Sequence, residues 1–364
     1  MNNLMSKFVP GLDLCQDFFH EIVHPILSRC FTGVEFSAAR LGHGSEVLGF
    51  DTPQSMDHDW GPARVDLFLK EDDYDSLAED INTILCEELP SMFRGIPTNF
   101  PINSTVTSNL NDGLITHRIW CTSIERFFRG YIGLNPLNGL QDADWLVIDP
   151  QYLRTISSGK VFYDGLNQLC DIQAIINNYY PTDVWFYLLS TQWTRISQES
   201  PFMARCGDVG DEIGSRLIST RMINEMMKLC FLMERQYWPY SKWFGTAFSK
   251  LACAKVLTPI FDLIINAKDW KTCEQYLSSA YIYIAEIHNT LRVTDFIEPK
   301  IVAFHERPYK VPEADLFSAA LYSKIESESV LKWPKNIGSV GKFVHSTDVL
   351  DNISHCKKLA AIYE

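Results

Sequence analysis

The segment LGHGSEVLGFDTPQSMDHDWGP, residues 41–62, combines a glycine-rich turn with two closely spaced aspartates. Residues 34–41 are short, mostly apolar and bounded by glycines, which predicts a strand. Gly42, Gly44 and Ser45 then predict a turn with outward-facing backbone N–H groups, followed by a short helix that presents its positive end. This order of strand, turn and helix predicts that Gly44 and Ser45 bind a phosphate group.

The two aspartates, Asp57 and Asp59, are one residue apart. On an extended segment, side chains at positions i and i+2 point to the same side. Paired carboxylates beside a phosphate-binding turn suit one or two Mg²⁺ ions, because Mg²⁺ prefers oxygen ligands and shares them with substrate phosphates. We therefore expect Asp57 and Asp59 to bind Mg²⁺, or Mn²⁺ in its place.

A family resemblance rests on these residues. Gly44-Ser45 followed by Asp57-x-Asp59 resembles the signature of the polymerase-beta-like nucleotidyltransferase superfamily. More closely, residues 44–51 and 57–62 resemble an uncharacterised microbial family of nucleotidyltransferase-like proteins that is catalogued as a domain of unknown function. The resemblance continues through three later segments and so covers most of the chain: residues 195–199, 205–212 and 239–243. It implies metal-dependent transfer of a nucleoside monophosphate, but it does not imply an acceptor.

The chain departs from the superfamily pattern at the third acidic ligand. Superfamily members usually place a third carboxylate on a strand that follows the Asp-x-Asp pair. Residues 116–123, which we expect to be extended, contain neither Asp nor Glu. Asp66 lies on the preceding predicted strand, residues 64–69, and is the candidate for a third metal ligand.

Composition limits the class of partner. The chain has 364 residues, enough for two domains, and a formal net charge of −13. An acidic chain is a poor match for polymeric nucleic acid, because phosphate neutralisation requires clustered Lys and Arg. A small basic pocket for ATP or another nucleoside triphosphate is compatible with this charge, as is a small-molecule acceptor.

The sequence also predicts a soluble, cytoplasmic protein with no membrane partner. Residues 1–7 lack the pattern of a secretory signal, and no apolar run reaches the length of a bilayer span. The ten cysteines contain no CxxC pair, which favours buried thiols over a zinc ribbon or a disulfide framework. The oligomeric state is left open.

The periodicity of apolar residues predicts an α+β fold. We expect an N-terminal nucleotidyltransferase-like domain with a small mixed sheet and flanking helices, residues 1–165, and a helical domain that closes a cleft over it, residues 166–364. Residues 90–113 predict a long loop, and residues 133–165 predict repeated turns. Helical spacing appears in seven segments: residues 11–23, 72–89, 166–180, 183–197, 208–237, 257–267 and 270–291.

Charged residues of the helical half complete the candidate site. Lys242, with Arg195 and Arg221 as weaker candidates, would contact the triphosphate, and Glu199 would be the base that activates the acceptor. For any single charge, an ion-paired or solvated helix face is the alternative. Glycines interrupt the same region and predict close approach of another backbone or of a ligand: Gly207, Gly210 and Gly214.

Three other motifs fail on spacing or context. Residues 20–24, HEIVH, match the H-E-x-x-H zinc pattern, but Pro25 is expected to disfavour helical geometry at His24. Residues 338–342, GSVGK, lack the spacing of a phosphate loop, and the pair Gly42-x-Gly44 lacks the third glycine of a dinucleotide fingerprint.

The resulting hypothesis is a Mg²⁺-dependent nucleotidyltransferase that moves a nucleoside monophosphate, most simply AMP from ATP, to a hydroxyl of a small molecule. A protein acceptor is the enzymatic alternative. A non-catalytic nucleotide-binding module, either a sensor or an interaction protein, is the alternative from another class, and the missing acid in residues 116–123 favours it.

Overall fold

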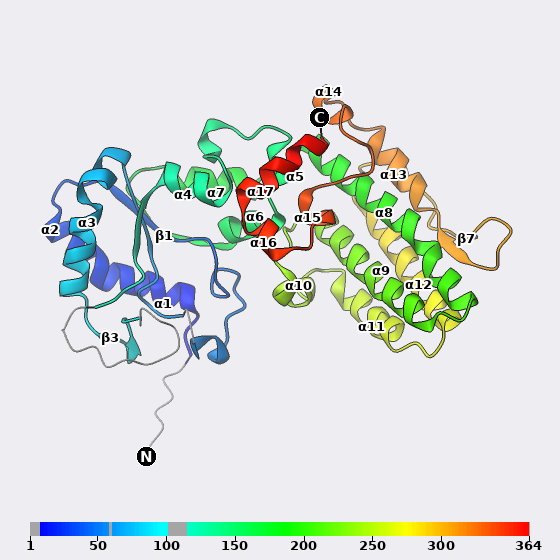
Figure 1. Ribbon diagram of the computed structural model, residues 1–364, viewed down its shortest axis with the longest axis horizontal. Coiled ribbons are helices and arrows are strands. Elements are labelled where there is room, and N and C mark those ends of the chain that lie inside the picture. The colour runs from blue at the N-terminus through cyan, green and yellow to red at the C-terminus, as the bar shows by residue number, and fades with distance from the viewer. Residues whose placement is uncertain (1–7, 58–59, 101–114, 364) are drawn as a thin grey trace, which may run out of the picture. The chain divides into compact units, whose positions relative to one another are not determined.

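The computed structural model describes residues 8–57, 60–100 and 115–363 (Figure 1). The chain forms two compact units: unit 1 comprises residues 1–139 and 152–178, and unit 2 comprises residues 140–151 and 179–364. The prediction divides the chain once, at residue 165, whereas the units alternate along it. Unit 1 contains a mixed four-stranded sheet and unit 2 is mainly helical, so the predicted α+β class is confirmed.

The sheet of unit 1 has the strand order β5-β2-β1-β6. β1 pairs antiparallel with both β2 and β6, and β2 pairs parallel with β5. The register aligns Ala39 of β1 with Asp66 of β2, so β1 ends at the edge where β2 begins. That edge carries the glycine-rich turn. The four strands are β1 (Phe36–Arg40), β2 (Asp66–Leu69), β5 (Trp120–Ser123) and β6 (Lys160–Asp164).

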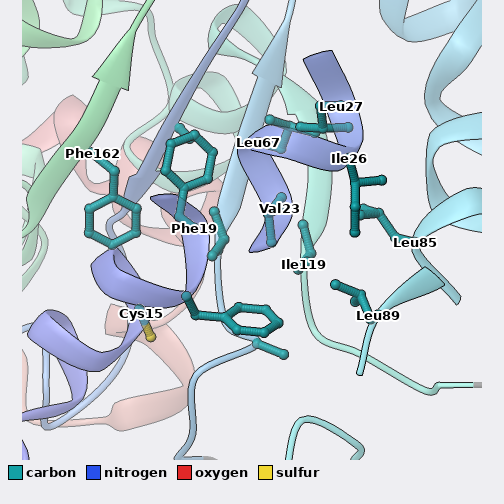
Figure 2. Close-up of a cluster of buried hydrophobic side chains, with 14 of the residues drawn as sticks. Cys15, Phe19, Val23, Ile26, Leu27, Leu67, Leu85, Leu89, Ile119 and Phe162 are labelled. Atoms are coloured by element: carbon teal, nitrogen blue, oxygen red, sulfur yellow. The ribbon is translucent and has the colours of Figure 1, made fainter. Parts of the chain in front are cut away.

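The core of unit 1 lies between this sheet and two helical segments. One segment is continuous and consists of α1 (Gly11–Phe18), a π-helical turn η1 (Phe19–Val23) and α2 (His24–Cys30). The other is α3 (Glu71–Glu88). Figure 2 shows Phe19 and Val23 among strand and α3 side chains, including Leu67 and Leu85. Each fully buried side chain of this size stabilises the fold by about 1.5–3 kcal/mol.

The expectation that Pro25 disfavours helical geometry at His24 is wrong. His24 has φ −60° and ψ −44°, and its N–H donates to the carbonyl of Phe19, five residues back. The widened π-helical turn accommodates the proline ring that a regular helix would exclude. The His24 ring packs edge-on against Phe19 and Tyr163, with centroid distances of 5.7 and 5.2 Å. These contacts are those of a packed aromatic side chain.

Residues 133–165, where only turns were expected, contain two α-helices, a short 3₁₀ helix and a strand. α6 (Pro150–Ser158) is preceded by Asp149, whose Oδ1 accepts a hydrogen bond from Gln151 N–H at 2.8 Å. An acidic cap followed by proline at the first helical position is a typical helix start. Asp149 and Pro150 therefore begin a helix here, although a turn was predicted for this region. Unit 1 also has smaller elements: η2 (Pro53–Asp57), β3 (Met92–Phe93), β4 (Ile96–Pro97), α4 (Ile124–Tyr131), η3 (Pro136–Asn138) and α7 (Leu169–Asn177).

Unit 2 is built around α8 (Thr182–Asp208), which packs against α9 (Glu212–Met233) and α13 (Ala314–Tyr322). Buried Trp193 of α8 stacks on Phe317 of α13 at 4.5 Å between ring centroids. The remaining elements are α5 (Asp144–Val147), α10 (Ser241–Phe248), α11 (Ala254–Ile265), α12 (Trp270–Thr290), β7 (Ile301–Ala303), β8 (Lys310–Pro312), α14 (Glu328–Leu331), α15 (Val340–Phe343), α16 (Thr347–Leu350), α17 (Ile353–Lys358) and η4 (Leu359–Ile362).

The predicted helix 183–197 ends too early, because α8 continues through Pro201. Proline cannot donate to the carbonyl four residues back. The Ser197 carbonyl instead accepts from Ser200 Oγ at 3.3 Å, so the helix passes the proline without leaving that carbonyl unpaired. In the part of the chain that the structure describes, no helix combines the length and apolarity needed to cross a bilayer.

Of the three glycines near the end of α8, Gly207 and Gly214 lie against side chains, where we expected close approach of another backbone or of a ligand. A Cβ on Gly207 would lie 2.2 Å from the Trp270 ring, so this glycine makes room for an indole. Gly210 has φ +81° and follows the end of α8. Gly214 N–H donates to Asp211 Oδ1 at 2.8 Å, which caps α9. The three glycines therefore belong to the packing and termination of helices.

Candidate functional site

The turn that follows β1 is a single closed turn without the short helix that we expected. Carbonyl oxygens of Gly44, Ser45 and Glu46 accept hydrogen bonds from Leu48 N–H at 3.4 Å, Phe50 N–H at 2.9 Å and Gly49 N–H at 3.1 Å, respectively. These bonds span four, five and three residues, so no single helical spacing repeats.

The backbone N–H groups of the first part of this turn, residues 44–47, are not engaged by described residues. Within the part of the chain that the structure describes, the backbone N–H groups of residues 44–47 donate no hydrogen bond, and neither does the Ser45 hydroxyl. Gly44 and Ser45 are half-buried. Four consecutive free amides in a turn form the kind of concavity that binds anions. The predicted turn therefore has backbone N–H groups at Gly44 and Ser45 that no described residue engages, and their role in binding a phosphate stays a prediction.

Gly44 is required in this turn for two reasons. Its φ of +153° lies in a region that other residues rarely adopt. A Cβ at this position would also lie 2.4 Å from both carboxylate oxygens of Glu46. Any side chain on Gly44 would therefore displace Glu46, which is itself buried.

Beneath the turn lies a buried cluster of two arginines and two carboxylates. Glu46 Oε1 accepts from Arg40 Nε at 3.0 Å, Arg40 Nη2 at 2.9 Å and Arg64 Nη1 at 2.9 Å. Arg40 Nη1 lies 3.5 Å from Asp66 Oδ2. Sequence reasoning missed Arg40, Glu46 and Arg64 as a group, because only the pairing of β1 with β2 brings them together.

The same cluster holds the backbone of the turn. Arg40 Nη1 donates to the Leu41 carbonyl at 2.7 Å, and Arg40 Nη2 donates to the His43 carbonyl. Arg64 Nη2 also reaches the His43 carbonyl, at 3.5 Å. The carbonyls of the turn are thus drawn toward the interior of unit 1.

Asp66, the candidate third metal ligand, lies at the start of β2. Its Oδ2 accepts from Leu41 N–H at 2.8 Å, and burial raises its pKa although nearby Arg40 opposes the shift. Burial and the neighbouring charge of Arg40 also lower the pKa of Arg64. Oδ1 of Asp66 accepts no hydrogen bond from the described residues, so one oxygen of this carboxylate is unengaged.

The segment that carries Asp57 and Asp59 is anchored at its two ends. Trp60 Nε1 donates to Asp51 Oδ2 at 2.9 Å, and Gly11 N–H donates to the same oxygen at 2.7 Å. Asp57 is the last residue of the 3₁₀ helix η2, not part of the extended segment that we assumed. Asp59 lies outside the described residues, so the relative orientation of the two carboxylates stays a prediction.

The three residues predicted to bind Mg²⁺, Asp57, Asp59 and Asp66, offer carboxylate oxygens, which are the ligands that this ion prefers. Among the residues with a described side chain, no group of three His, Cys, Asp or Glu is arranged to hold a metal ion. Only Asp66 of the predicted triad can be assessed, and its unengaged Oδ1 fits a ligand role.

In unit 2, three of the four predicted charged residues meet. Glu199 lies between Arg195 at 3.4 Å and Arg221 at 3.0 Å. The Glu199 side chain is 11% exposed, whereas those of Arg195 and Arg221 are 36% and 43% exposed. The buried carboxylate thus presents two guanidinium groups at the surface of α8 and α9. Lys242 is exposed and its ammonium lies 5.0 Å from the Trp243 ring centroid.

Two buried lysines of unit 2 were not anticipated as a pair. Lys228 donates to the Gly341 carbonyl at 3.1 Å, and Lys342 donates to the Thr191 carbonyl at 2.5 Å. Burial lowers the pKa of Lys342 to about 7. These two hydrogen bonds attach residues 338–342 of the C-terminal segment to α8 and α9.

Unit 1 also has an open hollow of about 340 Å³ at the edge of the sheet opposite the glycine-rich turn. It lies at the carboxyl ends of β2 and β5. Its acidic side chains are already bonded: Glu35 to Lys70, Glu71 to Ser123 and Arg126, and Glu125 to Arg129 and Asn135. The hollow is thus a separate feature from the predicted site.

Comparison with known proteins gives a match for one segment of the chain. No curated protein and no solved structure matches it. Residues 145–244 match the model of a family described as Domain of unknown function (DUF4037). This stretch, less than a third of the chain, includes Arg195, Glu199, Arg221 and Lys242 but not the glycine-rich turn. What the chain resembles over these residues is therefore a family without an assigned activity.

Proposed function

We propose that this chain is a Mg²⁺-dependent nucleotidyltransferase that transfers a nucleoside monophosphate, AMP from ATP, to a hydroxyl of a small molecule. The observation that carries the proposal is the turn at Gly44 and Ser45. Its amides at residues 44–47 donate no hydrogen bond within the described chain, while the Leu41 and His43 carbonyls that precede them accept from buried Arg40. The mixed sheet that presents this turn supports a nucleotidyltransferase-like arrangement of unit 1.

In this proposal the residues have separate roles. The Gly44 and Ser45 amides and the Ser45 hydroxyl bind the triphosphate. Within unit 2, Arg195, Arg221 and Lys242 are the proposed cationic residues and Glu199 is the proposed base for an acceptor hydroxyl.

Asp57, Asp59 and Asp66 would hold Mg²⁺. When bound, the ion offsets the negative charge that develops on the leaving pyrophosphate.

A second function, nucleotide binding without turnover, is favoured by two specific observations. β5 carries no acidic residue, and Oδ2 of Asp66 is already bonded to Leu41 N–H and close to Arg40. A binding module would retain the free amides of the turn and would need no third carboxylate. Stabilisation by ATP without release of pyrophosphate would identify it.

The location that we propose is the cytoplasm. All ten cysteines are free thiols, which suits a reducing compartment that also supplies ATP.

The experiment that tests the proposed reaction follows the label of α-³²P-ATP in the presence of Mg²⁺ and a panel of hydroxylated small molecules. Label in a new small product supports the proposed acceptor class. Label that moves to macromolecules in a lysate supports the protein AMP-transferase alternative. Label that stays in ATP under every condition contradicts transfer and leaves the binding module.

A further inference from the structure

We infer that Glu46 and Arg40 are positioning residues that fix the turn at Gly44 and Ser45 in a conformation able to receive a triphosphate. Neither residue is one of the positions of the superfamily signature, Gly44-Ser45 and Asp57-x-Asp59. The inference rests on the proposed function, because it assigns these residues to the binding of the same phosphate chain.

The first step concerns the direction of one peptide group. A trans peptide is planar, so its C=O and N–H point in opposite directions. The His43 carbonyl accepts from Arg40 and from Arg64, both of which lie beneath the turn. The N–H of Gly44, which belongs to the same peptide, therefore points away from the interior. Arg40 thus sets the orientation of the first free amide.

The second step concerns the charge of the cluster. The guanidinium groups of Arg40, which is buried, and of Arg64, whose side chain is 15% exposed, repel one another, and burial together with this repulsion lowers the pKa of Arg64. Glu46 Oε1 accepts from both at 2.9–3.0 Å and is itself buried. A buried charge is costly unless it is paired, so Glu46 compensates the charge of both arginines and holds them in place.

The third step concerns how Glu46 reaches the turn. Its carboxylate lies directly under the Gly44 backbone, where a Cβ would be 2.4 Å away. Movement of Glu46 would release Arg40 from one acceptor and open space beneath Gly44 at the same time. The planar guanidinium group of Arg40 donates hydrogen bonds to three acceptors: the Leu41 carbonyl, the His43 carbonyl and the Glu46 carboxylate.

The test measures binding of inorganic tripolyphosphate and of ATP to the full chain, by calorimetry, for the wild type and for Glu46→Gln. The matched control is Asp164→Asn. The Asp164 carboxylate also supports β1, through Ser37 Oγ at 2.8 Å, but it does so toward the other end of that strand. Urea unfolding of each variant shows whether the two substitutions cost comparable stability.

We expect Glu46→Gln to weaken the binding of both probes by about tenfold to a hundredfold, the range set by one hydrogen bond to a charged group. Asp164→Asn should leave binding unchanged. Adenosine, which lacks phosphates, should bind the wild type and Glu46→Gln equally, a result that general loosening of unit 1 would not produce. If Glu46→Gln does not fold, Glu46→Asp replaces it, because the shorter side chain keeps the charge but cannot reach both arginines.

Equal affinities of the wild type and of Glu46→Gln for tripolyphosphate would overturn this inference and leave the proposed function intact. If neither tripolyphosphate nor ATP binds to the wild type, both this inference and the proposed function are overturned.

Discussion

The backbone of Gly44 lies so close to Glu46 that a Cβ on Gly44 would be 2.4 Å from both oxygens of the Glu46 carboxylate. This contact couples the half-buried turn to the charged cluster that holds it. The turn keeps its conformation without a following helix because Arg40 and Arg64 bind carbonyls at its start: Arg40 donates to Leu41 and His43, and Arg64 donates to His43.

Gly44→Ala is expected to destabilise the protein by about 1–3 kcal/mol and to abolish ATP binding, because alanine brings both the strained φ and the clash with Glu46. Gly49→Ala is the control. Gly49 also has positive φ, +69°, but a Cβ there meets nothing within 4 Å. Urea unfolding and an ATP titration separate the two effects. ATP binding that survives Gly44→Ala, or that is lost equally in Gly49→Ala, would remove this turn from the site.

Glu199→Gln is expected to lower kcat by about a hundredfold or more while leaving KM for ATP unchanged, as the loss of a general base requires. Steady-state kinetics of the variant measures both constants. The opposite result, an unchanged kcat with a raised KM, would assign Glu199 to holding Arg195 and Arg221 in place.

Gly207→Ala is expected to destabilise unit 2 by about 1–3 kcal/mol, because the added methyl overlaps the Trp270 ring at 2.2 Å. Gly245→Ala in α10 is the matched control, since a Cβ there meets nothing within 4 Å. That substitution should be neutral or stabilising, as Ala favours helix over Gly. Thermal unfolding of both variants makes the comparison; equal stability would mean that Trp270 does not fill this space.

Lys342 predicts a pH dependence of stability. Burial and the nearby charges of Arg195 and Lys228 lower its pKa from 10.5 to about 7, although Glu225 opposes the shift. Between these two values the unfolded chain binds more protons, so the free energy of unfolding should rise with pH, by about 1.4 kcal/mol per pH unit at most. Below pH 7 both states are protonated and this dependence disappears.

Urea unfolding between pH 7.5 and 9.5 checks the Lys342 prediction when Lys342→Met is measured beside the wild type. The other titrating groups are shared, so the difference between the two slopes isolates Lys342. Parallel slopes would show that Lys342 keeps an ordinary pKa in the folded protein.

Regular elements were predictable where apolar periodicity dominates, as in α3 and α12, whose bounds differ from the predicted ones by only one residue at either end. Prolines caused most of the errors. Pro150 begins a helix, Pro201 lies within one, and Pro25 follows a π-helical turn. At Pro201 a side-chain hydrogen bond satisfies the carbonyl that the proline leaves free, and at Pro25 a wider turn accommodates the ring; neither is visible in local sequence. Asp149 and Pro150, by contrast, form a local helix-start signal that the turn prediction overlooked.

The candidate site was predictable only as far as its motif. Gly44 and Ser45 could be recognised because glycines and a hydroxyl residue follow a strand. Arg40, Glu46 and Arg64 could not, because single charges on a strand and in a loop carry no signal until β1 pairs with β2 and buries them. Glu199 was predicted as a base near Arg195 and Arg221, and α8 and α9 place it between these two arginines.

The most direct test of the proposed reaction is pyrophosphate release from each of the four nucleoside triphosphates with Mg²⁺ or Mn²⁺, in the presence of small-molecule acceptors, for the wild type and for Asp57→Asn and Asp59→Asn. Asp72→Asn, on the surface of α3, controls for the loss of a carboxylate elsewhere in unit 1. We predict release by the wild type and by Asp72→Asn, most strongly from ATP, and its loss in both motif variants. Undiminished release by Asp57→Asn and Asp59→Asn, or none by the wild type with any nucleotide, would contradict the proposed activity.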